Sequence, residues 1–104
     1  MHWIYLLVAI VFEVLGTLSI KQITITNNYY WVISVAVFYT LAFSLIAMAV
    51  KKIDIGTAYA IWAGVGTALI AVLGWLIFKE SMNLIKIIAI SFIVIGSIML
   101  KLQY

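Results

Sequence analysis

The chain has 104 residues, of which 68% are hydrophobic and only 9% are charged. Soluble domains carry about 25% charged residues, and a small globule needs polar residues to cover its large relative surface, so this composition excludes a soluble domain. It also excludes a disordered chain, which requires low hydrophobicity, and the lack of cysteine excludes disulfides and thiolate metal sites.

The first apolar segment spans residues 3–20 and is interrupted by a single charge, Glu13. At about 1.5 Å per residue of helix, Glu13 falls near the middle of a bilayer, where an acidic side chain costs about 2.5 kcal/mol or more. A structural explanation is a neutral, hydrogen-bonded carboxyl group or a pair with lysine, although no lysine lies at the same depth. The functional explanation is that burial disfavours the charged carboxylate, so Glu13 can hold a proton and exchange it for an organic cation.

Three small residues lie at helical spacings from Glu13, on the same face of the first segment. They are Ala9, Gly16 and Thr17. Their size either leaves space in front of the carboxylate or lets another helix approach closely. The spacing alone supports both explanations equally.

Three further apolar segments have about the 20 residues that a bilayer-spanning helix needs; they cover residues 29–50, 55–78 and 82–100. We therefore expect an all-α membrane protein in which residues 1–104 form a single domain of four transmembrane helices. The connecting loops are short, so consecutive helices should be antiparallel neighbours. A side-chain oxygen is expected to cap the second, third and fourth helices at Asn28, Asp54 and Ser81.

The third segment carries a ridge of small residues at every fourth position, which favours close helix packing; these are Gly56, Ala60, Gly64 and Ala68. Beside the ridge lie Tyr59, Trp62 and Ala63. Trp62 stands inside the span, so it either packs against a neighbouring helix or, together with Tyr59, offers an aromatic face to an organic cation.

Other spans supply further candidates. Tyr39 of the second segment could donate its hydroxyl to Glu13 or to a substrate. Gly64 and Gly66 each loosen the helix relative to alanine and predict a bend or hinge. Ala89 and Gly96 share one face of the fourth segment, which predicts a helix–helix contact between copies of the chain.

The lysines divide equally between the two membrane faces that four spans define. Lys51, Lys52 and Lys101 share one face, and the other carries Lys21, Lys79 and Lys86. Orientation normally follows an excess of Lys and Arg on the cytoplasmic side, so an equal division predicts insertion in both orientations and an antiparallel dimer. The alternative is that other signals fix one orientation.

Two stretches, FEVLGTLSIK and GTAYAIWAGVGTALI, together with four short spans, resemble the small multidrug resistance transporters along essentially the whole chain. In that family, a membrane glutamate binds proton and cation by turns in an antiparallel dimer. The resemblance implies that Glu13 couples the two ions and that Tyr39, Tyr59 and Trp62 line the pocket. It further implies a bend in the third helix at the two glycines already named, and a dimer contact near Ala89 and Gly96.

The branch of the family is indicated by the residues that follow the glutamate. Gly16 and Thr17 stand where the guanidinium-exporting branch has a nearby tryptophan, so the chain is more similar to the quaternary-ammonium branch. GTLSIK and AVKKIDIG also resemble a subunit of the paired spermidine exporters, although the balanced lysines favour a homodimer over a paralogous partner. Ala42 and Ala63 stand where the multidrug branch often has serine.

These observations predict a proton-coupled antiporter that exports lipophilic or quaternary ammonium cations from the cell across the plasma membrane. The alternatives are export of polyamines or guanidinium, a cation channel or leak, and a membrane subunit without transport. The sequence offers no second carboxylate or activated nucleophile at a useful spacing, so we expect no enzyme, and no cofactor, metal or nucleic acid is expected.

Overall fold

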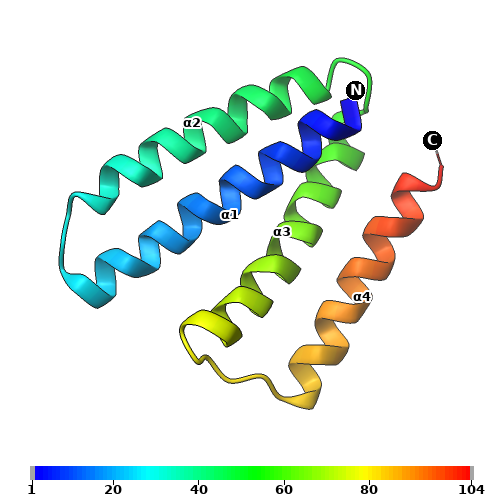
Figure 1. Cartoon of the computed structure of the whole chain (residues 1–104). Coiled ribbons are helices and arrows are strands. Elements are labelled where there is room, and N and C mark those ends of the chain that lie inside the picture. The colour runs from blue at the N-terminus through cyan, green and yellow to red at the C-terminus, as the bar shows by residue number, and fades with distance from the viewer. Residues whose placement is uncertain (1, 104) are drawn as a thin grey trace.

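A computed structural model describes residues 2–103 and shows four helices in this range, with no strand between them (Figure 1). They are α1 (His2–Thr26), α2 (Trp31–Ala49), α3 (Ile55–Ile77) and α4 (Leu84–Lys101). Each helix is long and apolar enough to cross a membrane. The predicted all-α architecture of four apolar helices is thereby confirmed.

The first helix continues beyond the predicted segment, from Ile20 to Thr26. The hydroxyls of Thr24 and Thr26 donate to backbone carbonyls one turn earlier, at 2.7 and 2.8 Å, so this polar end retains helical geometry. Asn27 then adopts a φ of 53°, the left-handed conformation that asparagine tolerates at helix ends. Glu13 consequently lies close to the middle of α1.

The three predicted N-caps have different outcomes. Asp54 caps α3 as predicted, because its carboxylate accepts the Thr57 N–H at 3.3 Å and the Thr57 hydroxyl at 2.9 Å. The Asn28 prediction is wrong: α2 has Tyr30 at the N-cap position, and the Asn28 side chain instead accepts the Tyr30 N–H at 3.1 Å in the preceding turn.

The Ser81 prediction is also wrong, because the loop after α3 continues two residues further. Asn83 caps α4 by accepting the Lys86 N–H at 2.8 Å. The Ser81 carbonyl has a different role and accepts a hydrogen bond from the Lys86 ammonium at 3.0 Å. Both asparagine and serine suit an N-cap, and the path of the loop decides between them.

The helices form a flat arrangement with extents of 43 × 34 × 17 Å. α1 and α2 pack as an antiparallel hairpin, α3 crosses against α1, and α4 lies along α3 (Figure 1). The buried core joins α1 to α3 and to the loop after α2; its members are Leu6, Ile10, Val14, Ala49, Ile53, Ala58 and Ile61. This core holds the first half of α1 against the first two turns of α3.

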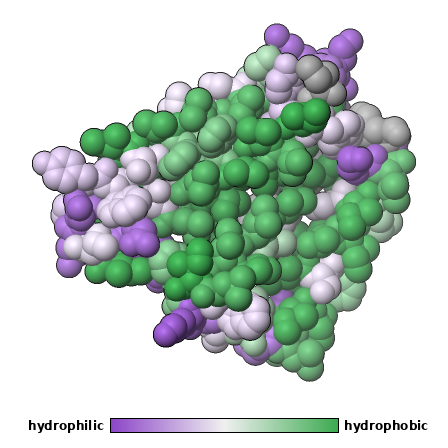
Figure 2. Space-filling model, viewed as in Figure 1, coloured by the Kyte–Doolittle hydropathy of each residue, from purple (hydrophilic) through white to green (hydrophobic). Residues whose placement is uncertain are grey.

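All four helices expose large apolar side chains. Figure 2 shows one face on which hydrophobic residues cover the middle of the molecule while hydrophilic residues gather at its ends. A soluble monomer rarely exposes a continuous apolar patch larger than a few hundred Å². The surface therefore suits a hydrocarbon environment along the helices and water at the loops.

Candidate functional site

Glu13 lies on α1 where this helix meets α3, and its side chain is partly buried. The carboxylate accepts a hydrogen bond from the Thr17 hydroxyl one turn later, with a distance of 3.0 Å. On its other side, Oε2 would lie 3.1 Å from a Cβ atom placed on Gly66 of α3. The missing side chain at Gly66 thus leaves room for the acid between the two helices.

Thr17 also contacts Tyr39 of α2, with 2.7 Å between the two hydroxyl oxygens. A threonine hydroxyl has only one proton to donate. Because Thr17 donates that proton to Glu13, Tyr39 must donate to Thr17. The three side chains form a chain of hydrogen bonds that ends on the carboxylate, and its direction can reverse when Glu13 is protonated and becomes a donor.

Gly16 and Ala9 have packing contacts within the chain. A Cβ atom at Gly16 would lie 2.7 Å from the Tyr39 ring, so the glycine admits the tyrosine that bonds to Thr17. Ala9 is completely buried. Of the two explanations for small residues near Glu13, close helix approach describes these two positions, and neither residue is among those lining the cavity at Glu13.

A cavity of 210 Å³ opens in front of the carboxylate. Its lining combines one acid, two aromatic rings and a hydroxyl, supplied by Glu13, Tyr59, Trp62, Ala63, Thr67 and Ile70. Four of these residues are candidates from the sequence, whereas Thr67 and Ile70 are not. Thr67 follows Ala63 by one helical turn on the same face of α3, and that spacing is the signal that could have found it.

Aromatic rings extend from this cavity toward α2. Trp62 meets Tyr59 and Phe43 edge to face, with ring centroids 5.4 and 5.6 Å apart, and Phe43 meets Tyr39 at 6.4 Å. Such geometries are favourable between aromatic rings. Phe43 was missed in the sequence, although it lies one turn after Tyr39 on α2, where i and i+4 side chains are neighbours.

The Trp62 indole N–H is buried and has no hydrogen-bond partner within residues 2–103. A buried donor without a partner is costly. The same indole forms one wall of the cavity at Glu13. Trp62 therefore offers this site an aromatic face, while its buried N–H has no partner among the described residues.

The third helix runs through Gly64 and Gly66 without interruption. At Gly64, an added Cβ atom would collide with the Ser97 hydroxyl of α4. Close approach therefore explains both glycines, with α4 at one and Glu13 at the other. On α4, Ala89 is exposed, and Gly96 is half-buried with no atom within 4 Å of an added Cβ, so among residues 2–103 nothing packs closely at these two positions.

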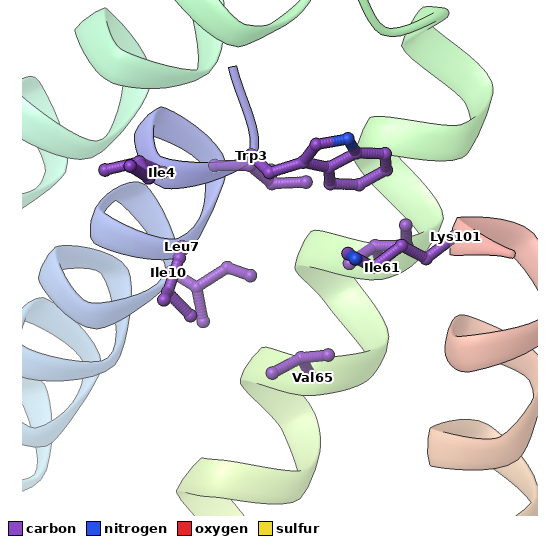
Figure 3. A pocket seen from close by; sticks show the side chains of 8 residues that line it. Trp3, Ile4, Leu7, Ile10, Ile61, Val65 and Lys101 are labelled. Carbon is purple, nitrogen blue, oxygen red and sulfur yellow. The ribbon is translucent and has the colours of Figure 1, made fainter. Parts of the chain in front are cut away.

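A second, apolar cavity of 290 Å³ lies between the first half of α1 and the first half of α3, with Lys101 of α4 at its edge (Figure 3). The Lys101 ammonium there lies 5.2 Å from the centroid of the Trp3 ring. This second cavity has no carboxylate in its lining. No group of three or more His, Asp or Glu residues within 2–103 is placed to hold a metal ion.

Fold and site together define a multi-pass membrane protein with one carboxyl group facing a cavity that contains aromatic rings. A family model described as Small Multidrug Resistance protein matches residues 1–95, so the chain belongs to this family of membrane transporters. The chain is also similar to YvaE of Bacillus subtilis (strain 168), described as an uncharacterized membrane protein. They are 36% identical over 102 residues, which cover 98% of this chain and 86% of YvaE.

Proposed function

We propose that the protein is a proton-coupled antiporter that exports lipophilic or quaternary ammonium cations. The observation that carries this proposal is the cavity in which the Glu13 carboxylate faces the rings of Tyr59 and Trp62. A carboxylate supplies the counter-charge that a buried cation needs. Aromatic faces attract the same cation without requiring hydrogen-bond donors on it, which suits a quaternary ammonium group.

The mechanism is exchange at one acid. Asp54 lies at the start of α3 and Glu80 in the loop after it, so Glu13 is the only acid within a helix among residues 2–103. Cation binds when Glu13 is charged, and protons from outside displace it by neutralising the carboxylate. A ligand shifts a conformational equilibrium only through its different affinity for the two states, so coupling requires that proton and cation exclude each other at Glu13.

We further propose that the working unit is an antiparallel homodimer in the cell membrane. Two observations support it: the lysines divide equally between the two faces, and α4 presents an uncovered face around Ala89 and Gly96. The flat shape of one chain, only 17 Å in its thinnest direction, leaves the Glu13 cavity at an open side. A second copy of the chain would complete the walls of this cavity.

The test is proton-driven transport in proteoliposomes with a panel of quaternary ammonium, guanidinium and polyamine cations. We expect exchange of protons for quaternary ammonium cations by the wild type and none by Glu13→Gln, with partial exchange by Glu13→Asp. Preference for spermidine or guanidinium would reassign the substrate. Current without obligatory exchange would indicate a channel, and altered assembly of Glu13→Gln without flux in any variant would indicate a structural subunit.

A further inference from the structure

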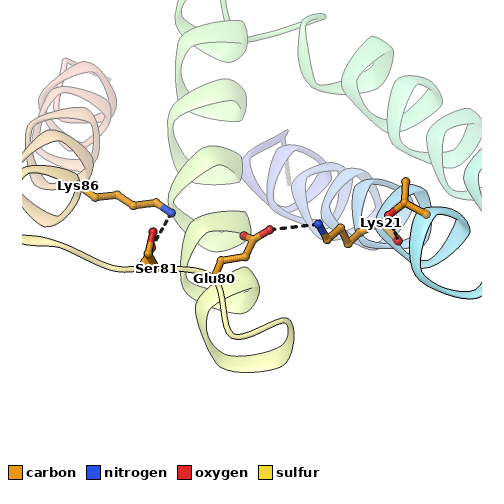
Figure 4. Close-up of polar contacts among 5 residues, drawn as sticks. Lys21, Glu80, Ser81 and Lys86 are labelled. Atoms are coloured by element: carbon orange, nitrogen blue, oxygen red, sulfur yellow. Dashed lines mark hydrogen bonds and ion pairs between the residues drawn. The ribbon is translucent and has the colours of Figure 1, made fainter.

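An ion pair joins the end of α1 to the loop after α3. The Lys21 ammonium lies 3.7 Å from a Glu80 carboxylate oxygen, and both side chains are a little under half exposed (Figure 4). Exposed ion pairs of this kind are weak, because water solvates both partners. Another cation can therefore replace Lys21 beside Glu80 without a large loss of free energy.

The loop places the Glu80 carboxylate against α3. The Gly74 carbonyl accepts the N–H groups of Phe78 and Glu80 at 3.0 and 3.2 Å, and Lys79 between them takes a φ of 58°. The Glu80 side chain then lies over Gly74, where an added Cβ atom would collide with the carboxylate. The position of this acid thus depends on the absence of a side chain at residue 74.

Glu80 borders a cavity of 290 Å³ that adjoins the Glu13 site. Its lining comes from the second half of α1, the second half of α3 and the following loop, and includes Thr17, Lys21, Ile70, Gly74 and Glu80. Two of these residues connect it to the inner site, since Ile70 also lines the Glu13 cavity and Thr17 bonds to Glu13. The two cavities therefore follow one another along the groove between α1 and α3.

We propose that Glu80 is an outer binding site for the organic cation on its path between water and Glu13, and that Lys21 occupies this site as a tethered cation when no substrate is present. This inference rests on the proposed function, because it concerns the access route to Glu13. The incoming cation displaces the Lys21 ammonium from Glu80 and then continues toward the inner carboxylate. The exchange needs no covalent step, only the replacement of one cation by another.

Charge variants give the first test, because the two partners should act in opposite directions. We measure the association rate of benzyltrimethylammonium with the purified, reconstituted protein by stopped-flow tryptophan fluorescence. Glu80→Gln should slow association by about three- to tenfold at low salt, because local steering is lost. Lys21→Gln should accelerate it several-fold. Both differences should shrink between about 0.01 and 1 M salt, as the screening length falls from about 30 to 3 Å.

Lys86→Gln is the matched control for Lys21→Gln. It removes the same charge from the same end of the molecule, but Lys86 bonds to the Ser81 carbonyl and not to Glu80 (Figure 4). Its association rate should stay within about twofold of the wild type. An acceleration equal to that of Lys21→Gln would mean that net charge, and not release of Glu80, sets the rate, and it would overturn the proposal.

Gly74→Ala separates the position of the acid from the charge of the protein. It changes no charge but displaces the Glu80 carboxylate from its place beside the cavity. We expect association to slow as in Glu80→Gln, while equilibrium affinity and proton release at Glu13 change less than twofold. An unchanged rate in both Gly74→Ala and Glu80→Gln would overturn the outer site.

The proposed function fails in a distinguishable way. If the wild type itself neither binds the probe nor releases protons on binding, the antiporter proposal falls. If the wild type does both, and the Lys21 and Glu80 variants either leave the rate unchanged or change it in the same direction, only the outer site is refuted. Size-exclusion profiles in detergent, compared with the wild type, identify variants that fail to fold. If Glu80→Gln fails to fold, Glu80→Asp replaces it. Because Glu80→Asp keeps the charge, its association rate should lie nearer that of the wild type.

Discussion

Thr17 is the link between Glu13 and Tyr39, since it donates to the acid and accepts from the phenol. Removing its hydroxyl breaks both hydrogen bonds, whereas removing the phenol hydroxyl breaks only one. Among the hydrogen bonds described, Tyr39 is therefore linked to the carboxylate only through Thr17.

Thr17→Val and Tyr39→Phe should be non-additive. A hydrogen bond to a charged group contributes about 1.5–3 kcal/mol, so Thr17→Val should weaken cation binding by about tenfold or more, and Tyr39→Phe by less. The double variant should bind as Thr17→Val alone does. Isothermal titration with a quaternary ammonium cation measures all three, and fully additive losses would show that Tyr39 acts directly on substrate.

Trp62→Leu tests the aromatic wall. The substitution keeps apolar bulk but removes the aromatic face, and a cation–π contact contributes about 0.5–2 kcal/mol. Affinity for a quaternary cation should fall by about two- to thirtyfold while the dimer persists. Trp75→Leu is the control, since this exposed tryptophan of the same helix lies outside the Glu13 cavity. If the two variants bind the quaternary cation with equal affinity, Trp62 has only a packing role.

Helix contacts distinguish two glycines that look alike in the sequence. Gly64 lies under the Ser97 hydroxyl of α4, whereas Gly96 faces open space in the single chain. The same substitution should therefore have different costs at the two positions. Gly64→Ala overpacks the α3–α4 contact and should cost about 1–3 kcal/mol of folding free energy.

The measurement is the unfolding of the detergent-solubilised protein followed by circular dichroism. Gly96→Ala is expected to leave the unfolding midpoint nearly unchanged at protein concentrations low enough to separate the proposed dimer, because an added Cβ meets no atom within the single chain. Combining Gly64→Ala with Ser97→Gly, which removes the colliding hydroxyl, should recover part of the loss. If Gly64→Ala is as stable as the wild type, the helices can separate freely at this point, and a hinge becomes the better explanation of the glycine.

The four helices could be predicted from the sequence, because an apolar segment of bilayer length has few structures open to it other than a transmembrane helix. Helical spacing likewise placed Tyr59, Trp62 and Ala63 on one face of α3, and the structure puts them beside Glu13. Contacts between elements could not be predicted in this way. The position of the Glu80 side chain over Gly74 depends on the conformation of the loop after α3. The spacing of residues in the sequence does not determine that conformation.

The whole molecule is expected to enter the membrane in both orientations. The basis of this prediction is the equal division of six lysines between the two membrane faces. The chain contains no cysteine, so Asn28→Cys, in the loop between α1 and α2, introduces a single reactive thiol. A membrane-impermeant maleimide should label about half of the molecules from each side. Labelling from one side only would contradict the antiparallel dimer.

The proton balance of the whole assembly is a further prediction. In the proposed exchange, a cation and a proton compete for Glu13, so adding substrate in weakly buffered detergent solution should release protons, and apparent affinity should weaken as the pH is lowered. Glu13→Gln should release none. Tight binding that neither releases protons nor depends on pH would defeat the exchange mechanism, even for a protein that transports cations.

The unequal lengths of the helices have a consequence for the surrounding lipid. α3 has 23 residues, none of them charged, and α4 has 18, which correspond to about 35 and 27 Å, whereas the hydrocarbon layer is about 30 Å thick. The α1–α2 hairpin is also inclined to the α3–α4 pair (Figure 1), so both cannot stand upright together. Hydrophobic mismatch is relieved by tilt or by local thinning. Bilayer thickness should therefore bias the angle between the two helix pairs, and transport rates should differ between short-chain and long-chain lipids.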